Sequence, residues 1–266
     1  MFFSLSFALV VVDDSSKRHT DGQSKTNGAM TGSVENADQL RIGGLTPLTS
    51  VDYPGELAAV IYCRGCPWRC PYCHNAELQN PDGPSQPTWP EVLNFLERRR
   101  GLLDAVVFSG GEPTAQRALA AAMAEVRAMG LKVGLHTGGP YPERLARLLP
   151  LVDWVGLDIK ALPEDYPRVT GAAGSGERAW ESLRLLLDAG VDLEVRTTPM
   201  PGLDDPAYLE RLSERLAETG VGCWALQQCR EVGGGDAVQR PRRLAASDPD
   251  VVTATRRFDR FALRAG

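Results

Sequence analysis

From residue 57 onward, short runs of apolar residues alternate with stretches in which apolar residues recur at helical spacing. Continuous apolar runs of this kind are typical of strands that are buried on both faces, as in a parallel sheet. The runs predict six strands, at residues 57–63, 104–109, 132–136, 153–158, 193–197 and 222–228. The pattern therefore favours an α/β fold.

The stretches between these runs carry the start and stop signals of helices. Thr88 stands where an N-terminal cap belongs, ahead of an apolar stripe at residues 92–96. Gly130 follows a second stripe, at residues 119–126, and glycine is common just past the last turn of a helix. A third stripe, at residues 180–187, ends in the same way. Helices are therefore expected to connect the strands.

The C-terminal region predicts one more helix. It is expected to open at Ser247, to have Pro249 near its start, and to carry Val251, Phe258 and Phe261 on its apolar side. This helix would complete the last of six strand–helix units.

Six units are fewer than the eight of a closed (β/α)8 barrel. A partial barrel of six units and an open doubly wound sheet both fit the pattern. In either fold, functional residues collect at the carboxyl ends of the strands. Polar residues and glycines do follow the predicted strands, at 63–75, 109–113, 136–139, Asp158 with Lys160, Arg196, and Gln227 with Gln228.

The composition of the chain argues against a nucleic-acid-binding protein and a membrane protein. A chain of 266 residues with 43% hydrophobic residues can bury a sizeable core, and a net charge of −5 gives no sign of nucleic-acid binding. No apolar run is long enough for a membrane helix, and we expect a cytoplasmic protein. Residues 1–40 are expected to be a disordered extension, with Met30 as an alternative start, and residues 41–266 to form the core domain with its C-terminal helix.

Four cysteines lie within eleven positions in the segment YCRGCPWRCPYCHN, at residues 62–75. Clustered thiols outside a secreted disulfide framework indicate metal or redox chemistry. A structural zinc site usually has four ligands in two separated knuckles, and only three residues separate Cys66 from Cys70. One tight loop can hold an iron–sulfur cubane, and the ligands Cys66, Cys70 and Cys73 would leave one iron open. Zinc, or Cys63 as a fourth ligand, stays an alternative.

The spacing C-x3-C-x2-C with Tyr72 before its last cysteine, together with GGEP at residues 110–113, resembles the radical S-adenosylmethionine (radical SAM) enzymes. The resemblance implies a partial (β/α)6 TIM-like barrel of the radical SAM type. It also implies one [4Fe–4S] cluster and S-adenosylmethionine (SAM) as cofactors. In this family, reductive cleavage of SAM yields a radical that abstracts a substrate hydrogen, so no catalytic side chain is expected beyond the cluster and SAM.

The resemblance extends to individual positions. Cys66, Cys70 and Cys73 correspond to the three cluster ligands. Glu112 would meet the ammonium group of SAM, and Lys160 its carboxylate. The full set of positions that correspond to SAM contacts is Tyr72, His74, Gly110, Gly111, Glu112, Asp158, Lys160 and Arg196.

Within this family, the sequence looks most like the activating protein of anaerobic ribonucleoside-triphosphate reductase, because of its small core, CHN at residues 73–75 and WALQQ at 224–228. The resemblance implies abstraction of a glycine Cα hydrogen from a glycyl radical enzyme, with a flavodoxin or ferredoxin-type electron donor. One departure is that residues 136–139 read HTGG where the activases commonly carry DTNG. The role of His136 therefore stays open.

Two other functions stay open. One is a small-molecule radical SAM enzyme, such as a 7-carboxy-7-deazaguanine synthase type, which should show carboxylate-binding basic residues inside the barrel. The other is a non-catalytic iron–sulfur or zinc-binding module, which would leave GGEP and DIK at 158–160 without a role. The role of Cys229 is also open.

Overall fold

The structure, a computed structural model, describes residues 36–230 and 240–264. Most of the expected N-terminal extension, including Met30, lies outside the described residues. Ala37–Gln39 form a 3₁₀ turn (η1), and Ala37 and Leu40 are buried in the core. The folded unit therefore includes residues 36–40, which the sequence analysis assigned to the extension.

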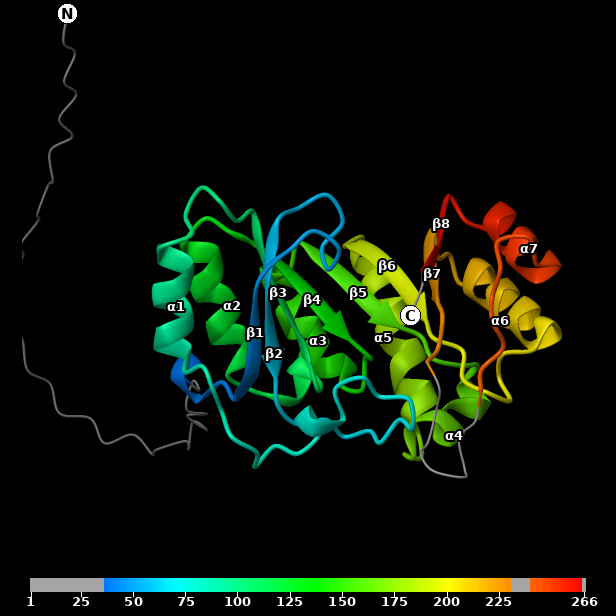
Figure 1. The fold of residues 1–266 in the computed structure, drawn as a ribbon, viewed down its shortest axis with the longest axis horizontal. Helices are drawn as coiled ribbons and strands as arrows, with labels where there is room; N and C mark the ends of the chain where they lie inside the picture. Colours follow the sequence, from blue (N-terminus) through cyan, green and yellow to red (C-terminus); the bar gives the residue numbers. More distant parts are fainter. Residues whose placement is uncertain (1–35, 231–239, 265–266) are drawn as a thin grey trace, which may run out of the picture. The chain divides into compact units, whose positions relative to one another are not determined.

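Eight strands form one sheet in the order of the sequence, from β1 to β8 (Figure 1). The strand order never reverses, as it would in a doubly wound sheet, so the sheet is the wall of a partial barrel. The two edge strands form no ladder with each other among the described residues, so the barrel is open between them. The six predicted strands are all present, as β2 Ala58–Cys63, β3 Ala105–Gly110, β4 Lys132–Thr137, β5 Trp154–Asp158, β6 Asp192–Thr197 and β7 Cys223–Gln227.

Two strands were not predicted. β1 (Ile42–Thr49) pairs antiparallel with β2, and β8 (Arg260–Arg264) pairs in parallel with β7. The prediction that one helix carries Phe258 and Phe261 was wrong, because α7 (Pro249–Arg257) ends before both. The backbone is already extended at Phe258, and the segment RFALR, with three consecutive apolar residues, pairs with β7 as an edge strand.

Helices and short 3₁₀ turns connect the strands. The cap expected at Thr88 is confirmed: its backbone N–H and its hydroxyl each donate to the Glu91 carboxylate at 2.8 Å. No helix within the described ranges is long and apolar enough to cross a membrane. The remaining elements are η2 Ala76–Leu78, α1 Trp89–Glu97, η3 Pro113–Ala115, α2 Leu119–Ala128, α3 Pro142–Leu148, η4 Leu149–Leu151, η5 Pro163–Asp165, α4 Tyr166–Thr170, α5 Ser175–Ala189 and α6 Pro206–Glu218.

The two faces of the sheet have different cores. A large apolar cluster fills the space between the sheet and its helices. The inner face carries a smaller cluster at the amino ends of the strands, where Tyr53 stacks on Trp154 with ring centroids 5.1 Å apart. Because this cluster closes one end of the barrel, the polar residues of the inner face gather at the other end.

Replacement of Trp224 by alanine tests the packing of the unpredicted strand. Its ring centroid lies 5.2 Å from that of Phe258 and 5.6 Å from that of Phe261, and its Nε1 donates to Thr197 at 3.0 Å. We expect Trp224→Ala to lower the free energy of unfolding by about 3–5 kcal/mol in urea titrations. Leu102→Ala, at a position that is 61% exposed, should change it by less than about 0.5 kcal/mol. Equal effects of the two substitutions would contradict this packing.

Candidate active site

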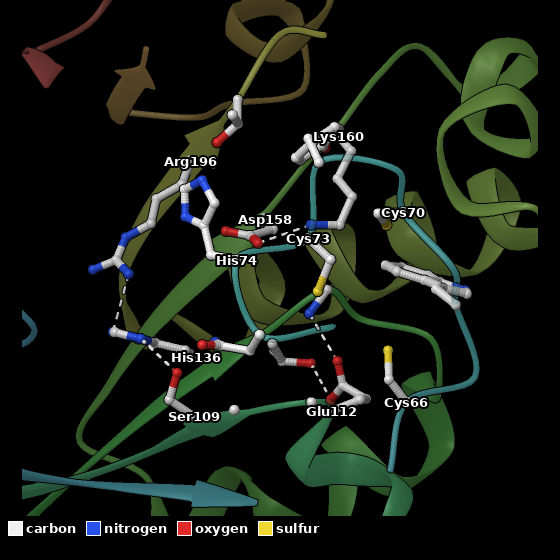
Figure 2. Close-up of a pocket in the computed structure, with 18 of the residues that line it drawn as sticks. Cys66, Cys70, Cys73, His74, Ser109, Glu112, His136, Asp158, Lys160 and Arg196 are labelled. Carbon is white, nitrogen blue, oxygen red and sulfur yellow. Dashed lines mark hydrogen bonds and ion pairs between the residues drawn. The ribbon is translucent and has the colours of Figure 1, made fainter. Parts of the chain in front are cut away.

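A pocket of about 380 Å³ opens at the carboxyl ends of the parallel strands (Figure 2). The structure brings all of the predicted site residues together in its lining: Cys66, Cys70, Tyr72, Cys73, His74, Gly110, Gly111, Glu112, Asp158, Lys160 and Arg196. They come from the loop after β2 and from the ends of β3, β5 and β6. Residues spread over 130 positions of the chain therefore meet at one site.

The cysteine loop is held at two points by backbone hydrogen bonds. At its start, the Cys66 N–H donates to the Gln79 carbonyl at 3.1 Å, and further along the Arg69 N–H donates to the Thr170 carbonyl at 2.8 Å. Burial, reinforced by the charge of Glu112, raises the pKa of Cys66 to about 12. Burial also raises the pKa of Cys70. Metal binding at these thiols would therefore release protons, since thiolates are the ligand form.

The glycine pair lets the end of β3 lie directly against this loop. Gly110 has φ +109°, and a Cβ there would stand 2.5 Å from backbone atoms of Cys63. A Cβ on Gly111 would stand 2.6 Å from the Gly65 carbonyl oxygen. These glycines are thus required for close packing of two backbones, beyond their predicted role beside SAM.

Glu112 is buried, and hydrogen bonds reach both of its carboxylate oxygens. Oε1 accepts from the hydroxyls of Thr114 at 2.5 Å and Thr137 at 2.7 Å, and Oε2 accepts from the Gly138 N–H at 3.0 Å. Burial raises the pKa of Glu112, although each of these hydrogen bonds opposes the rise. The segment HTGG therefore orients Glu112, a role that the sequence analysis did not foresee.

Asp158 and Lys160 form an ion pair of 2.9 Å on the pocket wall. Burial works against both charges, but their mutual attraction prevails: it lowers the pKa of Asp158 and raises that of Lys160. The ammonium group also lies about 6 Å from the ring centroids of Trp68 and Tyr72. A compact cation is thus fixed beside the cysteine loop.

Arg196 lies across the pocket from Cys66 and Cys70 (Figure 2). It is only 8% exposed, its Nε donates to Glu194 at 2.8 Å, and its Nη1 lies 3.0 Å from Nε2 of His136. Its guanidinium packs over the β5 backbone at Gly156, where a Cβ would stand 2.9 Å from Cζ. The ion pair of Arg196 with Glu194 is therefore buried.

A family model described as the radical SAM superfamily matches residues 60–214. A protein from Methanocaldococcus jannaschii that is named as a glycyl-radical enzyme activating enzyme is 30% identical over 196 residues, which cover 70% of this chain and 79% of the relative. The chain belongs to the radical SAM superfamily. The cofactors of this superfamily are a [4Fe–4S] cluster and SAM, in agreement with the prediction.

A second relative and a solved structure are also similar to this chain. The pyruvate formate-lyase-activating enzyme of Clostridium pasteurianum is 31% identical over 172 residues, or 62% of this chain and 71% of the relative. SuiB of Streptococcus suis, solved with its precursor peptide SuiA, superposes with a TM-score of 0.60 at 16% identity. The match covers 78% of this chain and 48% of SuiB, and at 16% identity it shows the shared fold alone.

The pocket of this radical SAM chain suits both cofactors. Three thiols from one loop open into it, which is the donor set for a cluster with one open iron. Two buried polar atoms, Tyr72 Oη and Arg196 Nη2, have no hydrogen-bond partner among the described residues. Unpartnered buried groups are costly, so a polar ligand in this pocket would stabilise them. The residues present therefore fit an iron–sulfur cluster and a ligand rich in hydrogen-bonding groups.

The structure also bears on the alternatives for the cysteines. Cys63 is fully buried in the helix-side core and does not line the pocket. Within residues 36–230 and 240–264, no group of three or more His, Cys, Asp and Glu side chains could hold a metal ion. The thiolates of a cubane bind different iron atoms, so they need not converge on one point.

Several pocket residues were not among the predicted site residues. Ser109, His136 and Thr137 lie on the strands, and His136 follows the alternation that puts every second residue of β4 on the inner face. That alternation was a usable signal. Trp68 had no such signal, because a tryptophan in a loop packs into the core as often as it lines a pocket. The other lining residues are Asn75, Gln79, Gly138, Thr198, Gln227, Gln228 and Arg230.

His136 joins three elements through its ring. Nδ1 lies 3.2 Å from the Ser109 hydroxyl, and Nε2 lies 2.8 Å from the Asp52 carbonyl oxygen as well as near Arg196. Burial, followed by the charge of Arg196, lowers the pKa of His136 to about 3. The imidazole is therefore neutral at physiological pH.

This pKa predicts a pH-dependent stability. Between pH 6.5 and about 3 the unfolded chain protonates His136 and the folded protein does not, so stability falls as the pH is lowered through this window. From pH 7 to pH 5 the loss should be on the order of 2 kcal/mol greater in the wild type than in His136→Asn. Urea titrations at the two pH values measure it. Equal losses in the two proteins would contradict a neutral His136.

Proposed function

We propose that this radical SAM enzyme activates a glycyl radical enzyme by abstracting a hydrogen from a glycine Cα of that partner. The relatives named as glycyl-radical enzyme and pyruvate formate-lyase activating enzymes support this proposal. The single observation that carries it is the convergence of three cysteines with GGE and DIK on one pocket of an open barrel. An open barrel suits a macromolecular substrate, because a glycine loop must reach the cofactors.

Each predicted residue has a task in this proposal. Cys66, Cys70 and Cys73 hold the cluster. The ends of β3 and β5 orient SAM: Glu112 meets the ammonium group, and Lys160 meets the carboxylate. Tyr72, His74, Gly110, Gly111, Asp158 and Arg196 complete the SAM contacts. When bound, the reduced cluster and SAM supply the hydrogen-abstracting radical.

The residues of this chain bind the cofactors and exclude water from the pocket. Hydrogen bonds from Thr114, Thr137 and Gly138 hold the Glu112 carboxylate in a fixed position on the pocket wall. Trp68 is 4% exposed and packs over Gly138, so it covers the side of the pocket next to the cysteine loop. The reactive carbon of the partner would enter from the open side of the barrel.

For the partner, we propose anaerobic ribonucleoside-triphosphate reductase, with pyruvate formate-lyase as the alternative that the names of the relatives favour. The sequence features CHN and WALQQ support the first choice. A cluster with thiolate ligands requires a reducing compartment, so we propose the cytoplasm and a flavodoxin or ferredoxin-type donor.

A small-molecule radical SAM reaction is the second candidate, because one observation favours it. Arg264 lies beside Arg196 on the inner face and shares Glu194 with it. Basic residues inside the barrel are what a carboxylate-bearing small substrate requires. Activation of a partner protein is preferred because of the named relatives.

Cysteine substitutions test the cluster assignment. Cys66→Ala, Cys70→Ala and Cys73→Ala should each lose bound iron and lower SAM-dependent formation of 5′-deoxyadenosine to background. Cys63→Ala is the matched control, since Cys63 is buried outside the pocket, and it should keep both. Iron analysis and product chromatography after anaerobic reconstitution measure these results. Loss of the cluster in Cys63→Ala alone would refute the assignment.

A partner assay tests the reaction itself. The reconstituted enzyme, SAM and a reductant are incubated with anaerobic ribonucleoside-triphosphate reductase or with pyruvate formate-lyase. We expect a glycyl radical signal in the EPR spectrum of the reductase, and none when its radical-bearing glycine is replaced by alanine. A signal only in the lyase would correct the partner. Rapid 5′-deoxyadenosine formation with a small acid, and no radical in either protein, would favour the second candidate.

A further inference from the structure

Residues 66–70 form the tight turn between the first two cysteines of the pocket. Two backbone N–H groups of this turn donate to other segments, from Cys66 to the Gln79 carbonyl at 3.1 Å and from Arg69 to the Thr170 carbonyl at 2.8 Å. These contacts fix where the turn lies. Its own carbonyl groups need other donors, because backbone polar groups in a packed loop are nearly always paired.

The side chain of Arg69 supplies those donors from within the turn. Its Nη1 donates to the Cys66 carbonyl at 2.6 Å and to the Trp68 carbonyl at 2.8 Å. Hydrogen bonds from a charged donor are shorter and stronger than those between neutral groups. One nitrogen therefore ties the first residue of the turn to the third, and the turn is closed before any metal is bound.

The closed turn also places a donor on the first thiol. Burial raises the pKa of Cys66, and a hydrogen bond from the Trp68 N–H opposes this rise. The Trp68 ring is buried, packs over Gly138 and lies 6.0 Å from the Tyr166 ring, measured between centroids. Because both its ring and its carbonyl are held, Trp68 keeps its N–H on the sulfur. Hydrogen bonds to the sulfurs help to set the reduction potential of an iron–sulfur cluster.

Arg69 also brings a positive charge into the cysteine loop. Within residues 36–230 and 240–264, no acidic side chain pairs with this guanidinium, whose contacts are with carbonyl groups. A guanidinium stays protonated in proteins. A cluster that takes up an electron becomes more negative, so a positive charge beside its ligands favours the reduced form.

We propose that Arg69 is a positioning residue that closes the turn between Cys66 and Cys70 and raises the reduction potential of the cluster. The inference rests on the assignment of the three cysteines as cluster ligands in the proposed function. It gives a role to a residue that the predicted site did not include. The role acts on the electron-transfer step that precedes cleavage of SAM.

Redox titration of the reconstituted holoenzyme, followed by EPR spectroscopy, tests this inference. At a fixed applied potential, Arg69→Ala should lower the ratio of reduced to oxidised cluster by about tenfold, a shift of about 59 mV to more negative potential. The variant should also lose iron to a chelator faster than the wild type, because its turn is no longer closed. A merely structural role of Arg69 would speed the loss of iron and leave the potential of the remaining cluster unchanged.

Two further variants separate the charge from the hydrogen bonds. Arg69→Lys keeps the positive charge, and its ratio of reduced to oxidised cluster should stay within about threefold of the wild-type ratio. Arg69→Gln keeps a donor without the charge, and its ratio should fall nearly as far as in Arg69→Ala. This fall should shrink in 1 M salt, where the screening length is about 3 Å. These two variants decide the question if Arg69→Ala holds too little cluster for titration.

Arg168→Ala is the matched control. Arg168 lies in α4, two residues before Thr170, and its side chain is 58% exposed and pairs with Asp165 at 3.0 Å. This variant should keep the wild-type potential and iron retention. Wild-type potentials in Arg69→Ala and Arg69→Gln, or an equal shift in Arg168→Ala, would overturn the inference. Wild-type protein that binds no iron would instead overturn the ligand assignment of the proposed function.

Discussion

The buried carboxylate of Glu112 is the interaction on which the site depends. Its oxygens accept hydrogen bonds from η3, through Thr114, and from the end of β4, through Thr137 and Gly138. Its backbone N–H donates to the Gly65 carbonyl at 2.8 Å, at the start of the cysteine loop. One residue therefore connects β3, β4 and the loop with the three thiols. A buried carboxylate is tolerated only with such a complete set of donors, so the local sequence is closely constrained.

The rest of the pocket has two electrically different sides. Near the cysteine loop, the Lys160 ammonium is balanced by Asp158. On the β6 side, Arg196 and Arg264 share Glu194, and a neutral His136 adds no charge. The first side suits a zwitterionic group, whereas the second retains a positive charge for an acceptor. Both sides lie at the carboxyl ends of parallel strands, where the fold gathers polar groups without disturbing the apolar core.

The elements that could be predicted from the sequence are those with a clear local pattern of apolar residues. All six buried strands were found because a parallel strand needs apolar residues on both faces. The residues of the predicted site were named from the resemblance of the cysteine spacing, GGEP and DIK to the radical SAM family, and they follow those strands. β8 was missed because its apolar run is only three residues long and Phe261 was assigned to the apolar side of the last helix. Residues Glu194 and Arg196 share one face of β6 by simple alternation, but their partner Arg264 is 70 residues away from Glu194. Pairing over such a distance depends on the strand order, which local patterns do not encode.

The central claim is that Cys66, Cys70 and Cys73 hold a cluster whose open iron faces a SAM site. EPR spectroscopy of the anaerobically reconstituted and reduced protein, with and without SAM, tests this claim most directly. The account predicts a [4Fe–4S]⁺ signal that shifts when SAM is added. A cluster signal that is identical with and without SAM, or bound zinc in place of iron, would contradict it.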